Sequence, residues 1–366
     1  LFKIKFIFIY CNYNFFIQFF IILFSIHQMI IKVILFYIVI FLTNIFIKKK
    51  NYLRSTTGSS HQNFANISIP LSGGIFLAFP IVYFLYEAYT AIIIVFLLFF
   101  LLGVFSDLNI INSPKKRFFF QLIILIVFTF YTQLEVFPTR IFIIDNYLMG
   151  TFISFFFTAF CLMVLINGSN FIDGLNGLLL GYFLIIILIL FKLNLFLLIE
   201  INTEVTFFII SIFSFILILN FSNQLFVGDN GAYSLSFLVG CLLIKIYNIN
   251  DYISPYFIIL LLWYPCFENL FSIIRKIIYK KNPLKPDNAH IHHYFFIFLK
   301  NKINLNKLWA NNLSSLIINS FNLFILYAGS LKPYYTILQV QLIFFSIFTY
   351  IIAYFFLRKL TLKNMK

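Results

Sequence analysis

Long apolar runs separated by short polar breaks make up most of this chain. Because a helix needs about 20 mostly apolar residues to cross the bilayer, each such run predicts a transmembrane span. The run 74–87 is short, and we expect Pro80 to kink it. The expected spans are 29–47, 74–87, 88–106, 118–134, 147–166, 177–193, 203–221, 230–248, 253–274, 308–329 and 334–357. The pattern predicts an all-α polytopic membrane protein with about 11 transmembrane helices and no linker long enough to separate domains.

The composition excludes several other classes of protein. Of the 366 residues, 62% are hydrophobic and 10% are charged, and the mean hydropathy is +1.00. A soluble domain has roughly 45–50% apolar and about 25% charged residues, and one aqueous core could not hide the surplus. The four cysteines lie far apart within apolar runs, without CxxC spacing, so neither a disulfide framework nor a zinc site is indicated. A soluble enzyme, a disordered tail and a secreted disulfide scaffold are therefore excluded.

Basic residues fall unevenly on the two predicted sides of the membrane. The formal net charge is +15, which in a soluble protein would suggest nucleic-acid binding. In a membrane protein the Lys/Arg bias of cytoplasmic loops explains the excess, so we expect no nucleic-acid partner. One set of loops and the tail carries 19 of the 26 Lys and Arg, against four on the other side and in the spans after residue 47. These segments, predicted to be cytoplasmic, are 48–73, 107–117, 167–176, 222–229, 275–307 and 358–366.

Residues 1–28 differ from the rest of the chain. They are a Phe, Ile, Lys, Asn and Tyr mixture without a motif, whereas Met29 opens a clean apolar run. We expect Met29 to be the native start and residues 1–28 to be a non-native upstream extension. An extra hydrophobic segment is the alternative, although no small-residue cleavage site is evident. Residues 29–366 are expected to form a single integral-membrane domain.

Five acidic residues mark a candidate site on the predicted cytoplasmic face. Each lies at the cytoplasmic end of a different span or in the last cytoplasmic loop, whereas the other six acids lie on or near the outer side. A transporter with ionisable residues near the bilayer midplane is the alternative, but Lys245 is the one obvious mid-span charge. The five acids are Asp107, Asp173, Asp229, Glu268 and Asp287. Single carboxylates gathered on one membrane face favour an active site there.

The first motif is the Asn/Asp/Gly-rich segment 167–177, placed between two apolar spans. Asn167, Asn170 and Asn176 offer amide groups, Asp173 offers a carboxylate, and the glycines allow a ligand to approach the backbone closely. A polar turn between helices is the alternative. The segment holds more amide side chains and glycines than a turn needs, which favours a ligand-binding site.

The second motif, 226–231, places Asp229 between glycines at the start of a span. A carboxylate at a helix N-terminus can hold a magnesium ion bound to phosphate oxygens. For this motif alone, a helix-capping aspartate is the favoured interpretation.

The third motif combines basic residues from Arg275 onward with His290, His292 and His293. A zinc site, a phosphate-binding cluster and a solvated loop are all open. No cysteine lies nearby to complete a structural zinc site, and imidazoles beside Arg and Lys more naturally bind a phosphate ester. A positive-inside loop explains the lysines but not the histidines.

The fourth motif is Ser106-Asp107, followed by the basic cluster 114–117 that ends in Arg117. A carboxylate followed by cations suits a metal ion and an anionic substrate. A helix cap with ordinary positive-inside flanking charge is the alternative.

In this order, the four motifs resemble those of the polyprenyl-phosphate N-acetylhexosamine-1-phosphate transferases, the WecA/MraY superfamily. The segment 167–177 is similar to N-x-x-N-F-x-D-G-x-x-G, and Gly228-Asp229 matches the metal-binding G-D. The segment 286–293 matches P-D-x-x-H-x-H-H, which is typical of the WecA-like branch rather than the peptidoglycan-precursor branch. Ser60-His61 and the segment 70–74 look like the first cytoplasmic loop of that family, so the resemblance runs from about Met29 to the end.

The resemblance implies transfer of a sugar-1-phosphate, expected to be N-acetylhexosamine-1-phosphate, from a UDP-sugar to undecaprenyl phosphate. UMP is released, and the lipid-linked sugar initiates a cell-envelope glycan such as lipopolysaccharide. It implies Mg²⁺ as cofactor, with Mn²⁺ as an alternative. The partners are then the two substrates and the bilayer of the bacterial cytoplasmic (inner) membrane, with the active site facing the cytoplasm. A homodimer is also compatible with the resemblance.

The resemblance also assigns roles to residues. Asp229 and Asp173 would be the metal ligands, and the catalytic residues would be Asp107, Asp173 and Asp229. Arg117 would stand where the family usually has a phosphate-binding lysine. The substrate-binding residues would be Asn167, Asn170, Asn176, Arg117, His290, His292 and His293.

Three further positions depart from the family pattern. Ser106 replaces the first of two adjacent aspartates, which has been proposed as the base for the lipid phosphate. Asn176 stands where many members carry aspartate, and Leu71 where they carry arginine. Because the second pKa of a phosphate monoester is about 6, the lipid phosphate is mostly dianionic at neutral pH, and direct attack needs no base. An inactive relative is the alternative, and the sequence does not identify the sugar.

Overall fold

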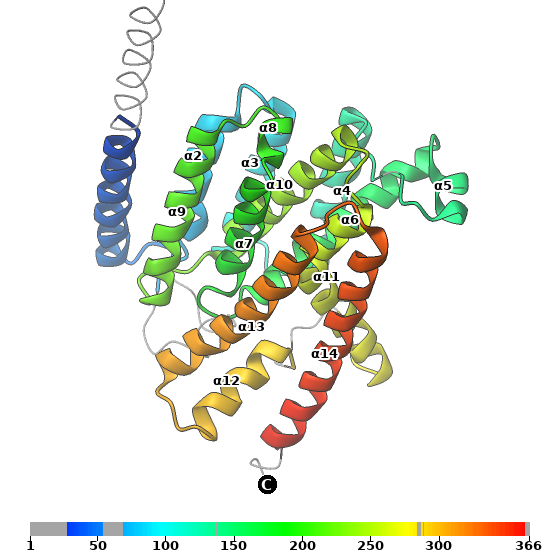
Figure 1. Ribbon diagram of the computed structural model, residues 1–366. Helices are drawn as coiled ribbons and strands as arrows, with labels where there is room; N and C mark the ends of the chain where they lie inside the picture. The colour runs from blue at the N-terminus through cyan, green and yellow to red at the C-terminus, as the bar shows by residue number, and fades with distance from the viewer. Residues whose placement is uncertain (1–27, 54–68, 137, 284–286, 288, 363–366) are drawn as a thin grey trace, which may run out of the picture.

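A computed structural model describes residues 28–53, 69–136, 138–283, 287 and 289–362, and this part of the chain is a bundle of helices (Figure 1). The helices are Gln28–Lys50, α2 Gly73–Leu85, α3 Thr90–Asp107, α4 Pro114–Thr132, α5 Phe142–Leu148, α6 Phe152–Ile172, α7 Leu178–Lys192, α8 Leu195–Leu198, α9 Thr203–Phe221, α10 Gly228–Ile249, α11 Pro255–Ile278, α12 Ile291–Asn301, α13 Lys307–Ser330 and α14 Thr336–Leu362. The extension expected at 1–28 falls, but for its last residue, outside the described residues, as do Ser60, His61 and Pro286.

Each expected span corresponds to one helix of the bundle. Among the described residues, eight helices are long and apolar enough to cross a membrane. Helices α2 and α7 are apolar but shorter, with 13 and 15 residues, and α4 opens with three cations. The all-α, multi-pass membrane class is therefore confirmed.

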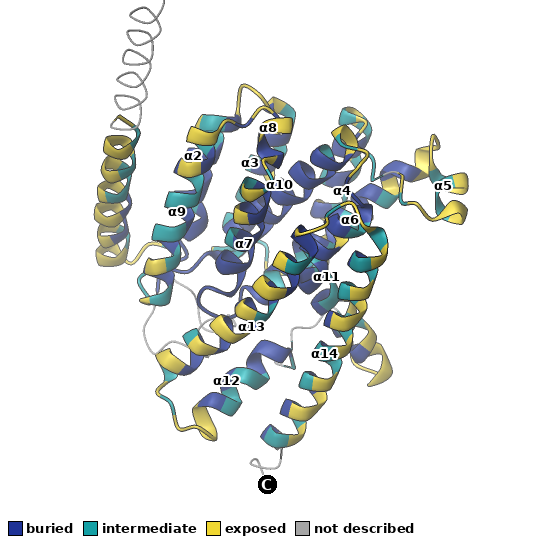
Figure 2. Cartoon of the chain, in the orientation of Figure 1, coloured by how far each residue is buried: buried dark blue, intermediate teal, exposed yellow. Residues whose placement is uncertain are grey.

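Helix α10 forms the centre of the bundle (Figure 2). In the most apolar stretch of α10, 83% of the residues are buried. The corresponding share is only 11% in Gln28–Lys50 and 22% in the α14 span. Helix α10 packs against α2, α3 and α6. The outer helices expose Phe, Ile and Leu, which suits side chains that face lipid tails.

Glycines bring the first turn of α10 against α2 and α3. A Cβ atom at Gly103 of α3 would lie 2.3 Å from Asn230 Cα and 2.5 Å from the Asp229 carbonyl carbon. A Cβ at Gly74 of α2 would lie 2.4 Å from Gly231 N. Small residues allow helix backbones to approach this closely within a membrane bundle. The N-terminus of α10 is thereby placed beside the C-terminal end of α3.

Two expectations about the loops are wrong. The segment 167–176 is not a loop throughout, because α6 continues to Ile172 and carries Asn167 and Asn170 on its last two turns. The segment 275–307 contains α12, which begins directly after His290. Hydropathy ends a span at its first polar residues, but a helix continues where those residues meet other helices instead of lipid. The short helices α5 and α8 were also not expected.

Candidate active site

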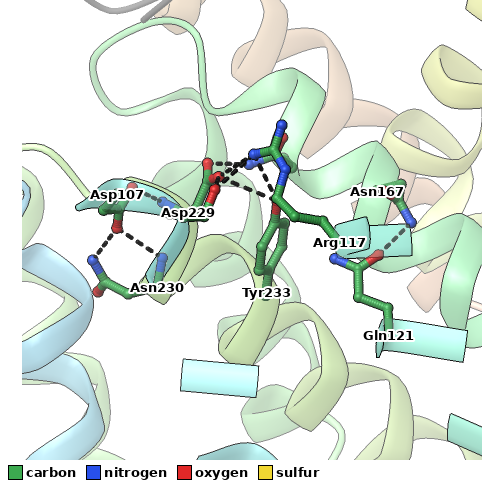
Figure 3. Close-up of polar contacts among 9 residues, drawn as sticks. Asp107, Arg117, Gln121, Asn167, Asp229, Asn230 and Tyr233 are labelled. Atoms are coloured by element: carbon green, nitrogen blue, oxygen red, sulfur yellow. Dashed lines mark hydrogen bonds and ion pairs between the residues drawn. The ribbon is translucent and has the colours of Figure 1, made fainter. Parts of the chain in front are cut away.

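The Asp229 carboxylate lies in the first turn of α10 and accepts hydrogen bonds from three other helices and from its own helix (Figure 3). Its Oδ2 accepts from Ser106 Oγ at 2.5 Å, from Arg117 Nη1 at 2.8 Å and from the Tyr233 hydroxyl at 3.1 Å. Its Oδ1 accepts from Asn170 Nδ2 at 2.6 Å. The ends of α3, α4, α6 and α10 therefore meet at one carboxylate.

Asp107 holds the start of α10 in place. Its Oδ1 accepts from the Asp229 backbone N–H at 3.0 Å, and its Oδ2 accepts from the Asn230 N–H at 3.1 Å and from Asn230 Nδ2 at 2.6 Å (Figure 3). The first N–H groups of a helix have no partner within the helix, and a negative charge there is favourable. Asp107, rather than Asp229, is thus the capping aspartate of α10, and a catalytic role for it stays a prediction.

Ser106 and Arg117 form one unit with Asp229. The same Arg117 Nη1 that contacts Asp229 also lies 2.7 Å from Ser106 Oγ. The Ser106 hydroxyl therefore accepts from the guanidinium and donates to the carboxylate. Side chains of Arg117 and Asp229 are 26% and 23% exposed, so the ion pair is shielded from bulk water but reachable from it.

Asn167 lies one turn deeper in α6 than Asn170. Its Nδ2 donates to Gln121 Oε1 at 3.1 Å and to the Met163 carbonyl at 3.0 Å (Figure 3). Gln121 is fully buried in α4. The described contacts of Asn167 join α6 to α4 and so position Asn170, whereas substrate binding by Asn167 stays a prediction.

Asp173 ends α6, and the loop that it opens touches the histidines of α12. A Cβ at Gly174 would lie 2.8 Å from His292 Nε2 and 3.4 Å from His293 Nε2. Asp173 is itself buried and lies next to this contact. The first and third motifs, more than 100 residues apart, thus come together as the sequence analysis expected.

The three histidines are buried, unlike those of a solvated loop. His290, His292 and His293 are at most 5% exposed, and the His292 and His293 ring centroids lie 4.3 Å apart. His290 Nδ1 lies 2.8 Å from Glu268 Oε1, and the other oxygen of Glu268 accepts from the Tyr350 hydroxyl at 2.6 Å. Glu268 was singled out as an acid of this face but not as a site residue. Its partner His290, which directly precedes α12, could not be identified from spacing in the sequence.

Asp287 binds Arg275 through two parallel hydrogen bonds. Arg275 Nη1 lies 3.0 Å from Asp287 Oδ2, and Nη2 lies 3.1 Å from Oδ1. Burial alone would raise the pKa of the Asp287 carboxyl, but the hydrogen bonds from Arg275 and the nearby charges of His290 and Arg275 hold this pKa below its ordinary value. The ion pair ties the end of α11 to the segment that leads into α12.

Asn176 lies in a buried network of amide side chains, and substrate binding by Asn176 stays a prediction. It is 2% exposed, and its Nδ2 donates to Asn223 Oδ1 at 2.7 Å and to Asn312 Oδ1 at 3.1 Å. Its backbone N–H donates to Asn311 Oδ1 at 2.8 Å. These contacts hold the α6–α7 loop against α13. The geometry supports a structural role for Asn176.

The described arrangement does not fit a divalent cation at Asp229. Within the described ranges, no group of three or more His, Cys, Asp or Glu side chains is close enough to hold a metal ion. Both oxygens of Asp229 face hydrogen-bond donors, and one of those donors is a guanidinium cation. Metal binding by Asp229 and Asp173 therefore stays a prediction.

The middle of the chain matches a known enzyme family. Residues 89–247 match the family model for glycosyl transferase family 4. This segment runs from the N-cap of α3 through most of α10, and it contains Asp107, Arg117, Asp173 and Asp229. The match covers less than half of the chain, and it agrees with the resemblance drawn from the motifs.

Three curated relatives carry names of the same kind. The chain is 32% identical over 187 residues to undecaprenyl-phosphate alpha-N-acetylglucosaminyl 1-phosphate transferase of Thermotoga maritima, covering 51% of this chain and 55% of that protein. It is 26% identical over 215 residues to a probable undecaprenyl-phosphate N-acetylglucosaminyl 1-phosphate transferase of Bacillus subtilis, covering 57% and 58%. It is 27% identical over 150 residues to decaprenyl-phosphate N-acetylglucosaminephosphotransferase of Mycolicibacterium smegmatis, covering 35% and 37%. The match thus spans little more than half the length of the first two relatives.

Proposed function

We propose that this protein transfers a sugar-1-phosphate from a UDP-sugar to undecaprenyl phosphate at the cytoplasmic face of the bacterial inner membrane, and releases UMP. The observation that carries the proposal is the meeting of four helix ends at Asp229, together with the Gly174 loop, which follows the same end of α6 and contacts His292 and His293. A polar cluster with cations at one end of an apolar bundle suits two anionic substrates, one of which is anchored in the bilayer.

The proposed reaction is a direct displacement at phosphorus. An oxygen of the lipid phosphate attacks the phosphorus that carries the sugar, and the bond from that phosphorus to the bridging oxygen breaks, so that UMP leaves with this oxygen. The lipid phosphate is largely dianionic at neutral pH because its second pKa is about 6. No side chain has to remove a proton, so Ser106 in place of a carboxylate is compatible with activity.

The residues of this chain would act mainly by placing charge. Arg117 and the α12 histidines would neutralise phosphate oxygens, and Asn170 and Asp107 would keep Asp229 and the start of α10 in position. Dependence on Mg²⁺ or Mn²⁺ is part of the proposal and rests on the family resemblance. UDP-N-acetylglucosamine is the first donor to test, because the relatives are named for that sugar.

The test is release of UMP by the full chain purified in detergent, with undecaprenyl phosphate, Mg²⁺ and a panel of UDP-sugars. We expect release that requires the lipid and falls about 100-fold or more in Asp229→Asn, because the carboxylate organises the site. The matched control is Asp251→Asn, since Asp251 is exposed in the connection between α10 and α11. No release with any donor from folded protein would contradict the proposal and favour an inactive relative. Release without lipid would indicate hydrolysis instead of transfer.

A further inference from the structure

We propose that Arg117 is an internal counter-cation of Asp229, and that the guanidinium lowers the affinity of this carboxylate for a divalent cation. This inference deepens the proposed function, on which it rests because it concerns the same site. It follows from a disagreement between the resemblance, which implies a metal at Asp229, and the structure, which places a cation of the chain itself there.

The first argument is the geometry of the ion pair. Arg117 Nη1 lies 2.8 Å from Asp229 Oδ2, a typical distance for a charge-assisted hydrogen bond. Both side chains are about one quarter exposed, so this pair is screened less than a pair on the open surface. A divalent cation that takes Asp229 Oδ2 as a ligand would have to replace this bond and would meet a fixed positive charge.

The second argument is the charge balance that Ser106 creates. The Ser106 hydroxyl accepts from Arg117 at 2.7 Å and donates to Asp229 at 2.5 Å, so one neutral group joins one cation and one anion. A carboxylate at position 106 would add a second negative charge against Asp229, which one guanidinium could not balance. With Ser106, Arg117 and Asp229 balance each other's charge, and the Asp107 carboxylate lies apart from this pair on the backbone N–H groups of α10. Serine at this position and arginine at 117 therefore act together to lower the affinity for a divalent cation.

The third argument is what the displaced side chain can do. Arginine offers five N–H donors in a planar fork that matches phosphate oxygens, and Arg117 already lies partly exposed beside the cluster. Its release from Asp229 would leave the guanidinium free to bind a substrate phosphate.

The test measures Mn²⁺ binding to the full chain in detergent, without substrates, from the electron paramagnetic resonance signal of free Mn²⁺. We expect Arg117→Gln to bind Mn²⁺ about tenfold more tightly than the unmodified protein, because a charge-assisted bond no longer competes. Arg117→Lys keeps the charge without the fork and should bind with intermediate affinity. The matched control Lys115→Gln removes an exposed cation two residues away and should change the affinity less than about twofold.

A second measurement places the ion. The double variant Arg117→Gln/Asp229→Asn should lose the gain in Mn²⁺ affinity, because the carboxylate that received the ion is gone. Equal or weaker binding in Arg117→Gln, an equal gain in Lys115→Gln, or tight binding that survives Asp229→Asn would each overturn the inference. These results do not depend on UMP release, so a failure of the proposed transferase activity is distinguishable from a failure of the counter-cation.

Discussion

At the residue scale, two aspartates of similar sequence context have different surroundings. Asp107 accepts from two backbone N–H groups and one amide of the α10 N-terminus, whereas Asp229 accepts from side chains that include a cation. Backbone donors at a helix N-terminus are held in place by the helix and have no other partner within it, so they favour keeping the carboxylate. Side-chain donors can exchange for a ligand. Asp229 is therefore the carboxylate whose partners can exchange for a ligand, and Asp107 positions it.

This difference predicts the effect of removing Asp107. We expect Asp107→Ala to lower the free energy of unfolding by about 1–2 kcal/mol, because the first N–H groups of α10 lose their acceptor. Thermal unfolding in detergent measures the loss, and Asp251→Ala serves as the control at an exposed site. UMP release should fall in parallel with stability. Unchanged stability with abolished release would mean that Asp107 acts on the substrate.

At the scale of elements, two glycines determine how closely α3 and α2 approach the first turn of α10, which carries Asp229. Gly103 and Gly74 let the backbones of α3 and α2 touch the first turn of α10. The resulting contact brings the end of α3, with Ser106 and Asp107, to within hydrogen-bond distance of Asp229 and Asn230. Helix packing here is therefore part of the geometry of the candidate site.

Substituting Gly103 tests this role. A Cβ at Gly103 would collide with backbone atoms of α10 at 2.3 to 2.5 Å, and backbone atoms cannot rotate away. We expect Gly103→Ala to cost about 1–3 kcal/mol or more in thermal unfolding and to weaken UMP release. Gly240→Ala is the matched control on α10, because its Cβ would meet only leucine methyl groups of α6. Equal effects of the two substitutions would contradict the backbone argument.

At the scale of the whole molecule, the apolar surface and the basic loops together determine how the bundle sits in the membrane. Outer helices such as α14 expose large apolar side chains to lipid, while the basic loops prefer the cytoplasm. The site residues lie at the same end of the helices as the basic loops. The orientation therefore decides which compartment the site faces.

Cysteine labelling tests the orientation. Helix α11 has 24 residues, about 36 Å at 1.5 Å per residue, so Tyr252 before it and Lys281 after it lie on opposite sides. In a protein whose native cysteines are replaced, we expect a membrane-impermeant thiol reagent to label Tyr252→Cys in intact cells. Lys281→Cys should react only in inverted vesicles. The reverse pattern would contradict a cytoplasmic site.

The amino-acid sequence alone determined which segments are helices in the membrane, because the transfer of apolar side chains from water to lipid is a local property of each run. It also located the motifs that meet at the site, since the chemical groups of Asp229 and the α12 histidines, a carboxylate and imidazoles, are known from the residue type alone. It missed the extension of α6 through Asn170 and the presence of α12, where polar residues face other helices.

Only the tertiary structure decided the partners of each charged group. Asp229 is 112 residues from Arg117, and Asp107 is 123 residues from Asn230, so neither pairing can be read from spacing. Likewise Glu268 accepts a hydrogen bond from the hydroxyl of Tyr350, which lies 82 residues further along the chain. The physical reason is that a hydrogen bond forms or fails over tenths of an ångström, and such distances are set by the close packing of whole helices rather than by local composition.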